Sequence, residues 1–450
     1  MLFTRIVKTA VISLIILNLA PNNLTATNAV LTPAPKNHDA HSLQNLSLDD
    51  IEAGLTPLKS TTPAQWRISW SGDAARSATI SWSTSQKSST NTLYYDTIDH
   101  KHRITDYKNR IQCQINGKYS TRLGFTKSAY YHHATLKNLK PDTAYYFIMS
   151  SDGITSRRLW FMTAPATGCS FSLLHGGDSR SRHLNRCRMN LLIANLVKQD
   201  PRIIALLHGG DYVMNGNSWN HWKNWLSHNE LTTGGNGRVL PIIPVRGNHD
   251  EGPIFHEVFN LPDWYTTRLG HDIAIISFNS EEVLEKDKTK NFPNKNLQWL
   301  DSELAKLRPQ TRWLLANYHL PLYPAVKSIP HQTAILAPIF EKYNIDLGCE
   351  CDGHNIKRTV PIRNGRQDPT GITYIGEGGM GVTQRTPKKD RWYLAFAARG
   401  NHIMKLSFSE SQLKIQTILQ NTKLLNTFTL PPHPHHPISY PIPARKNNYR

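Results

Sequence analysis

The sequence predicts a two-domain protein in which an all-β sandwich precedes an α/β domain built in layers. Short alternating strands rich in Trp, Tyr and Thr occupy residues 61–165. Between residues 168 and 420, apolar strands alternate with longer helical patterns. The length of 450 residues suffices for two or three domains, and 39% hydrophobic and 19% charged residues exclude a membrane bundle and a wholly disordered chain.

Residues 1–29 are expected to be a secretory signal peptide. Arg5 and Lys8 precede an apolar run from Ala10 to Ala20, which is far shorter than the roughly 20 residues that a spanning helix needs. Small residues follow up to Ala29, as a cleavage site requires. We therefore expect an exported protein, periplasmic or extracellular, with no membrane span in the mature chain. An uncleaved anchor is the alternative.

The front domain has the pattern of half-buried strands separated by turns. Residues 30–60 lack periodicity and are interpreted as a linker. A Pro141–Asp142 turn before a run of tyrosines resembles a turn of fibronectin-III-like modules. By itself such a sandwich specifies no chemistry. The expected strands are residues 65–70, 78–84, 92–97, 130–136 and 143–150.

The second domain alternates strands with helices and ends in a hairpin. Helical patterns cover Leu184–Gln199 and Leu297–Leu307, and residues 403–419 form the closing hairpin. Residues 430–450 are rich in Pro and His and are interpreted as a disordered tail. The expected strands are residues 169–177, 202–210, 239–247, 273–280, 311–319, 344–350 and 372–379.

The five cysteines are expected to be buried free thiols. Export permits a disulfide, but an odd count leaves at least one thiol over.

The charge balance favours an anionic partner. Lys and Arg number 52 against 33 Asp and Glu, which gives a net charge of +19. We expect a small phosphorylated substrate. Nucleic acid is disfavoured because the sequence has no basic–aromatic repeat and no groove-reading motif. The oligomeric state is not indicated.

Polar side chains follow the expected strands of the second domain at the points where these strands end. Ligands of open α/β sheets bind beyond the carboxyl ends of strands. Each Gly-Asp or Gly-Asn step alone is typical of a turn or a helix cap, but the ordered set is not. Mixed oxygen and imidazole donors suit a pair of Fe, Mn or Zn ions. The candidate ligands are Asp178, Asp211, Asn248, His319, Asp352 and His354.

This order of motifs resembles the calcineurin-like metallophosphoesterases. The sequence runs Gly-Asp, Gly-Asp, Gly-Asn-His-Asp, a His after a strand, and then a His-bearing loop. With the fibronectin-III-like front domain, it resembles their purple acid phosphatase branch. The resemblance covers residues 60–420. It implies an α-β-β-α layered second domain and a dinuclear centre that hydrolyses phosphate esters.

Carried over to this chain, the resemblance assigns a role to each ligand. Asp178 would bind the first metal, Asp211 would bridge both, and Asn248 and His319 would bind the second.

The last family motif is Gly-His-x-His followed by an Arg, here Arg358. The alignment makes His354 a ligand of the first metal and puts Asp352 where the family has a second-metal His. A carboxylate there shifts the preference toward Mn, Fe or Ca rather than Zn.

Two departures from the family concern the first metal. Purple phosphatases have a tyrosine ligand three residues after the bridging Asp, where this chain has Met214. Other members have a His two residues after the first Asp, where this chain has Arg180. The first site is therefore expected to be weak, filled with water or lost, and no purple colour is expected. Arg180 is interpreted as a contact for the substrate phosphate, with an ion pair as the alternative.

Other polar residues complete the expected site. The resemblance makes His249 the catalytic His, which would donate a hydrogen bond to the phosphoryl oxygen or protonate the leaving alkoxide. Asp250 could orient it or cap a turn. Lys327 and His331 lie near the family's substrate histidines, and His331 is a candidate phosphate contact. Glu377 is a weaker candidate for a substrate contact.

We therefore expect a secreted phosphomonoesterase that is acid phosphatase-like. A metal-bound hydroxide at a dinuclear centre would attack phosphorus. Two alternatives remain open: a phosphodiesterase acting on nucleotides or lipid head groups, and a non-catalytic binding protein with a decayed metal site.

Overall fold

A computed structural model describes residues 46–284, 295–388 and 390–433. The expected signal peptide, the first part of the expected linker and residues 434–450 of the expected tail lie outside these ranges. Among the described residues, no helix is long and apolar enough to cross a membrane.

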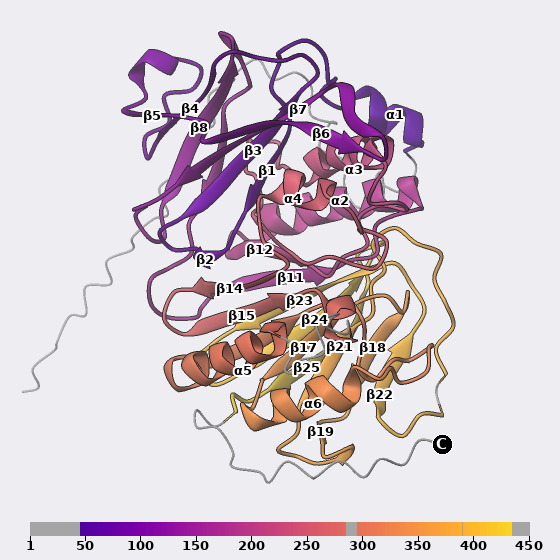
Figure 1. The fold of residues 1–450 in the computed structure, drawn as a ribbon. Coiled ribbons are helices and arrows are strands. Elements are labelled where there is room, and N and C mark those ends of the chain that lie inside the picture. The colour runs from indigo at the N-terminus through magenta and orange to yellow at the C-terminus, as the bar shows by residue number, and fades with distance from the viewer. Residues whose placement is uncertain (1–45, 285–294, 389, 434–450) are drawn as a thin grey trace, which may run out of the picture. The chain divides into compact units, whose positions relative to one another are not determined.

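The front domain is a sandwich of antiparallel strands, as the sequence predicts (Figure 1). Trp66, Ile68 and Trp70 recur at every second position of the first strand and pack in the same core as Leu93 and Phe147 from the facing sheet. One face consists of β1 (Ala64–Ser69), β3 (Ala78–Thr84), β7 (Gly124–Leu136) and β6 (Ile115–Thr121). The other consists of β10 (Leu159–Met162), β8 (Ala144–Ser151), β4 (Asn91–Asp96) and β5 (Asn109–Gln112), with β9 (Ile154–Thr155) beside β8.

Two large sheets face each other in the second domain. The first contains, in order, β25 (Leu424–Leu430), β24 (Leu413–Leu419), β23 (His402–Phe408), β11 (Ser172–Gly176), β12 (Ile203–His208) and β13 (Ile242–Pro244). The second contains β14 (Trp264–Leu269), β15 (Ile273–Phe278), β16 (Trp313–Asn317), β17 (Leu347–Glu350), β21 (Thr373–Gly376), β18 (Ile356–Thr359) and β22 (Leu394–Ala398). A small hairpin joins β19 (Ile362–Arg363) to β20 (Arg366–Gln367).

The strands of the front domain continue both of these sheets. Ser69 of β1 pairs in parallel with Ile242 of β13, and the Trp70 N–H donates to the Ile242 carbonyl at 3.0 Å. The short strand β2 (Gly72–Asp73) pairs with β14. Backbone hydrogen bonds therefore join the two domains, which the sequence treats as separate units.

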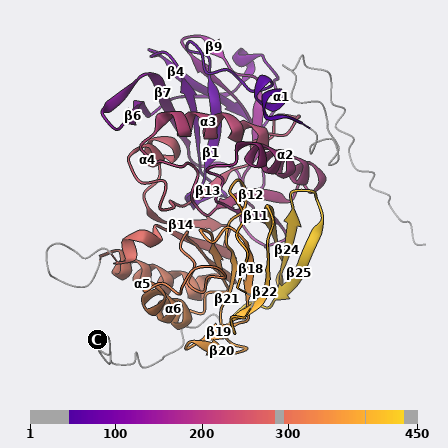
Figure 2. The same cartoon turned by 90° about the vertical axis from the view of Figure 1, so that its right-hand side faces the viewer.

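Helices cover the outer faces of the two sheets and complete four layers, helix–sheet–sheet–helix. Neighbouring residues of β11 face opposite ways: Leu173 packs in the core between the sheets, and Leu174 packs with Met189 of a covering helix. In Figure 1, α5 and α6 lie beside the second sheet, where Leu304 and Phe340 pack. Figure 2 shows β24 and β25 extending the first sheet beyond β11 and β12.

The helices of this domain are α2 (His183–Gln199), α3 (Trp219–Asn229), α4 (Ile254–Phe259), α5 (Lys295–Leu307) and α6 (Thr333–Lys342). Short 3-10 turns are η2 (Ile104–Asp106), η3 (Glu230–Thr232), η4 (Ser280–Leu284) and η5 (Arg308–Gln310).

Part of the expected linker is structured. Ser47 and Asp50 form a capping box at the start of α1 (Leu48–Ala53). Ile51 of this helix packs with Cys187 and Leu231 of the second domain. Leu48 and Ile51 are too few apolar positions for a periodic pattern in a six-residue helix, so the sequence does not reveal it.

The five cysteines are free thiols, as expected. Four are buried and Cys113 is partly buried. Cys351 lies against the backbone of Gly177 and Gly209, where an added Cβ would come within 2.5 Å of its Sγ. This thiol therefore fills the space beneath the loops that follow β11 and β12.

Candidate metal centre

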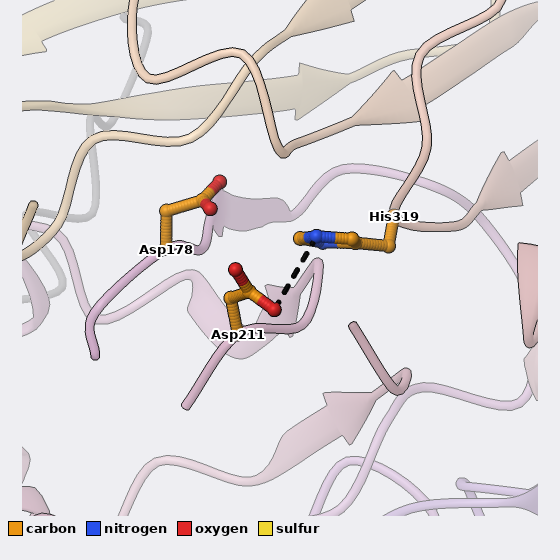
Figure 3. A group of neighbouring side chains, drawn as sticks. All are labelled: Asp178, Asp211 and His319. Carbon is orange, nitrogen blue, oxygen red and sulfur yellow. Dashed lines mark ion pairs between the residues drawn. The ribbon is translucent and has the colours of Figure 1, made fainter. Parts of the chain in front are cut away.

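The loops after five strands of the two facing sheets meet at one place. Asp178 follows β11, Asp211 follows β12, Asn248 follows β13, His319 follows β16, and Asp352 and His354 follow β17. Figure 3 shows Asp178, Asp211 and His319 pointing toward one another, and their ligand atoms lie within 4.8 Å of each other. The residues predicted from five separate stretches of sequence therefore come together.

The backbone is strained at four of these positions. Asp178, Asp211, Asp352 and His354 have φ of 54°, 57°, 68° and 57°, in the left-handed region that non-glycine residues seldom occupy. Such conformations cost roughly 1–3 kcal/mol each and concentrate at functional sites. Four left-handed residues around one cluster indicate that these backbone conformations orient the side chains toward the cluster.

Three oxygen donors surround the Nε2 atom of His319. The Oδ1 atoms of Asn248, Asp211 and Asp352 lie 3.2, 3.4 and 3.9 Å from it. Ligands about 2.1 Å from a shared ion lie roughly 3.0–3.5 Å apart in octahedral or tetrahedral geometry. These residues, the predicted ligands of the second metal, therefore fit an ion with only small shifts.

His319 is held in the orientation that a metal ligand needs. Its buried ring donates from Nδ1 to the Gly209 carbonyl at 2.7 Å, which leaves Nε2 facing the other donors. Burial lowers the pKa of His319, but the surrounding carboxylates, Asp211 foremost, outweigh it and raise the pKa to about 9. Without a metal, Nε2 of His319 binds a proton, and the positive charge of the ring then partly neutralises the surrounding carboxylates.

Asp178 also carries an oxygen suited to a cation. Its Oδ2 accepts the Asp352 N–H at 2.7 Å, whereas its buried Oδ1 has no hydrogen-bond partner among the described residues. That Oδ1 lies 3.2 Å from Nε2 of His354. Burial raises the pKa of Asp178, as expected for a carboxylate whose charge is incompletely compensated.

Two cationic side chains enter the centre. Arg180 donates from Nε to Oδ2 of Asp211 at 2.8 Å, and its side chain is only 12% exposed. Lys327 donates from Nζ to both oxygens of Asp352 at 2.6 and 2.7 Å, and its side chain is 43% exposed. The sequence points to Arg180 as a phosphate contact and puts Lys327 near the family's substrate histidines, and the structure adds that each contacts a predicted metal ligand.

Asp250 has a positional role that the sequence leaves open. Its fully buried carboxylate accepts N–H bonds from Asp211, Tyr212 and Gly247 at 2.7, 2.9 and 2.9 Å, and a longer one from Val213 at 3.3 Å. It fastens the loop after β12 to the loop after β13. Among the described residues it makes no hydrogen bond to the His249 side chain, so the turn-cap interpretation is the one that the contacts favour.

His249 lies at the edge of the centre. Its N–H donates to Oδ1 of Asp211 at 3.0 Å. Its ring nitrogen Nδ1 lies 3.0 Å from the Met214 carbonyl, which can only accept, so Nδ1 carries the proton. The other ring nitrogen, Nε2, is then available for a hydrogen bond to a substrate. The side chain is half-buried, which gives it access to solvent.

Other predicted positions lie apart from the ligands. His331 is exposed just before α6, and its side chain makes no hydrogen bond within the described residues, so its phosphate contact stays a prediction. Glu377 is buried and accepts from Ala325 N–H and from Asn355. These contacts occupy its carboxylate, and the substrate contact of Glu377 stays a prediction. Tyr212 is buried and stacks on His208, and burial raises its pKa well above the usual value.

Comparison with known proteins agrees with the fold and the motifs. Residues 63–163 match the family model "Purple acid Phosphatase, N-terminal domain", and residues 166–354 match "Calcineurin-like phosphoesterase". Purple acid phosphatase 1 of Ipomoea batatas is 26% identical over 348 residues, 70% of this chain and 68% of that protein. Fe(3+)-Zn(2+) purple acid phosphatase 12 of Arabidopsis thaliana is 23% identical, covering 70% of this chain and 69% of that protein.

A solved structure has the same fold. Purple acid phosphatase PPD1 of yellow lupin (Lupinus luteus) superposes with a TM-score of 0.70 over 85% of this chain and 78% of that chain, at 16% identity. The chain therefore contains a purple acid phosphatase N-terminal domain followed by a calcineurin-like phosphoesterase domain. Within the calcineurin-like phosphoesterases the chain is purple acid phosphatase-like, and the matches indicate a hydrolase of phosphate esters.

Proposed function

We propose that the protein is an exported, metal-dependent phosphomonoesterase. The observation that carries this proposal is a set of four donor atoms: Nε2 of His319 and three oxygens within 3.9 Å of it. Similarity to proteins named purple acid phosphatases supports the monoester as substrate. The expected signal peptide supports export, and the positive net charge of +19 would draw an anionic substrate.

Asp211, Asn248, His319 and Asp352 would hold a divalent ion. Such an ion, when bound, polarises a phosphate oxygen and lowers the pKa of water. The three oxygens favour Mn or Fe, Zn is also compatible, and Ca is the remaining candidate. The dinuclear centre stays a prediction, because Arg180 lies among the predicted ligands of the first ion.

The side chains of the chain itself would position the substrate and the leaving group. His249, with its proton fixed on Nδ1, can accept at Nε2 in its neutral form, or donate from Nε2 to the leaving alkoxide when it is doubly protonated. The loops fastened by Asp250 hold Asp211 and Asn248 at fixed separation. Lys327 and Arg180 provide positive charge beside two of the donors, Asp352 and Asp211.

Turnover of nitrophenyl phosphates tests the proposal. The purified protein would be incubated with mono- and bis-nitrophenyl phosphate after chelation and after addition of Mn, Fe, Zn or Ca in turn. We expect monoester turnover that chelation abolishes and metal restores. Asp211→Asn and Asn248→Ala should lower it by about 100-fold or more. The control Asn220→Ala, on the exposed face of α3, should leave it unchanged.

The other outcomes identify the alternatives. Faster turnover of the diester than of the monoester would point to a phosphodiesterase. Absence of turnover with every metal, together with loss of all metal on dialysis, would point to a non-catalytic protein.

A further inference from the structure

Arg180 makes contacts that a metal ion would make. Its Nε donates to Oδ2 of Asp211 at 2.8 Å, its Nη2 lies 3.3 Å from Nε2 of His354, and its Nη1 lies 3.0 Å from Sδ of Met214. Asp211 and His354 are predicted ligands of the first metal, and Met214 stands where purple phosphatases have their tyrosine ligand. We propose that the Arg180 guanidinium takes the place of the first metal ion, so that the centre binds a single ion beside His319.

The charges at the centre favour one ion over two. Asp178, Asp211 and Asp352 bring three negative charges when ionised, and Arg180 and Lys327 bring two positive ones. One divalent ion that displaces the Lys327 ammonium leaves the three carboxylates formally balanced by that ion and Arg180. A second ion beside Arg180 would leave two positive charges in a buried site, where charge repulsion is weakly screened.

The two cations differ in how firmly they are held. The Lys327 side chain is 43% exposed, and only its ammonium group, at the end of a flexible chain, contacts Asp352. A metal ion can therefore displace it toward solvent. Arg180 is 12% exposed, and a planar fork with three contacts fixes it. The thioether of Met214 is neutral and contacts the guanidinium. A tyrosinate at this position would instead favour a metal ion, because it carries a negative charge.

The guanidinium remains able to act on substrate. Arginine has five N–H donors, and the contacts with described residues use three of them. Two remain for a phosphoryl oxygen at the position that the first metal serves in the dinuclear family. This inference rests on the proposed metal-dependent function and adds that one metal ion, together with Arg180, suffices for it.

Metal stoichiometry tests the inference directly. The full-length protein would be saturated with Zn²⁺ or Mn²⁺, passed through gel filtration and analysed for metal per chain. We expect one equivalent for the wild type and two for Arg180→His, which exchanges the cation for an imidazole ligand. Arg182→His is the matched control: this exposed residue two positions on bonds to Thr383, and we expect one equivalent.

A second measurement uses colour. Arg180→Ala combined with Met214→Tyr, loaded with ferric iron, should gain a visible charge-transfer band, because a tyrosinate is then beside the vacated position. The single variant Met214→Tyr keeps the guanidinium and should lack the band. Circular dichroism confirms that each variant is folded.

The results separate this inference from the function. Two equivalents in an active wild type would overturn the single-ion centre and leave the phosphatase proposal intact. A folded Arg180→His that still binds one ion, with no band in the double variant, would also overturn it. A wild type without any bound metal would overturn both.

Discussion

Replacing Asp250 with alanine should loosen both loops that build the centre. The buried carboxylate accepts four backbone N–H bonds, from Asp211, Tyr212, Val213 and Gly247 at 2.7–3.3 Å. Alanine leaves these donors without an acceptor, at about 1–3 kcal/mol each. Because water can enter the space left by the carboxylate, we take the lower value for each, which gives a loss of about 4 kcal/mol in the free energy of unfolding.

Thermal unfolding measures this loss. A change of 1 kcal/mol shifts the melting temperature by about 2–4 °C in chains of 150–250 residues, and less in longer ones, so a loss of about 4 kcal/mol is expected to lower it by at most about 8 °C. Asp250→Asn keeps one oxygen, and therefore two of the four bonds, and should melt between the wild type and Asp250→Ala. An Asp250→Ala protein that melts within about 2 °C of the wild type would refute the reasoning.

Three further predictions concern the centre and the domain boundary. Gly247→Ala should weaken Zn²⁺ binding by about 10-fold or more in equilibrium dialysis, because a Cβ there would lie 2.3 Å from Oδ1 of Asp211. Lys327→Gln should raise Zn²⁺ affinity severalfold in a chelator competition, because an ion must displace the Lys327 ammonium from both oxygens of Asp352. Burial raises the pKa of Glu230 to about 7, so the folded state holds this proton more tightly and stability falls as pH rises from about 4.5 to 7. Glu230→Gln should remove this dependence, which is worth about 3 kcal/mol, in denaturant unfolding at pH 5 and pH 8.

Each of these predictions has a control or a contradicting result. Gly235→Ala, whose Cβ would meet nothing within 4 Å, should bind Zn²⁺ like the wild type. An unchanged or lower Zn²⁺ affinity in Lys327→Gln would contradict the displacement of the ammonium. For Glu230→Gln, the stability difference from the wild type should grow between pH 5 and pH 8, and a constant difference would contradict the raised pKa of Glu230.

Much of the fold follows from local patterns in the sequence. Strands of period two and helices of period 3.6 predict the sandwich and the layered domain, and the Leu173–Leu174 alternation of β11 shows the physical basis. The predicted ligands also meet, because Gly-Asp and Gly-Asn steps at strand ends place polar side chains at the same edge of facing sheets.

Contacts between distant residues are not visible in such patterns. The pairing of Ser69 with Ile242, which joins the domains into continuous sheets, depends on how two sheet edges fit. The packing of Ile51 and the four N–H bonds to Asp250 likewise join segments far apart in the chain. No local spacing encodes them.

The sequence by itself therefore determined which side chains could bind a metal and phosphate, because these depend on residue type and on strand ends. The tertiary structure decided how the charges are arranged among them. It puts Arg180 against Asp211 and His354, and Lys327 against Asp352. Whether a cationic side chain faces solvent, substrate or a carboxylate depends on three-dimensional distance and burial, since both set the strength of the electrostatic interaction.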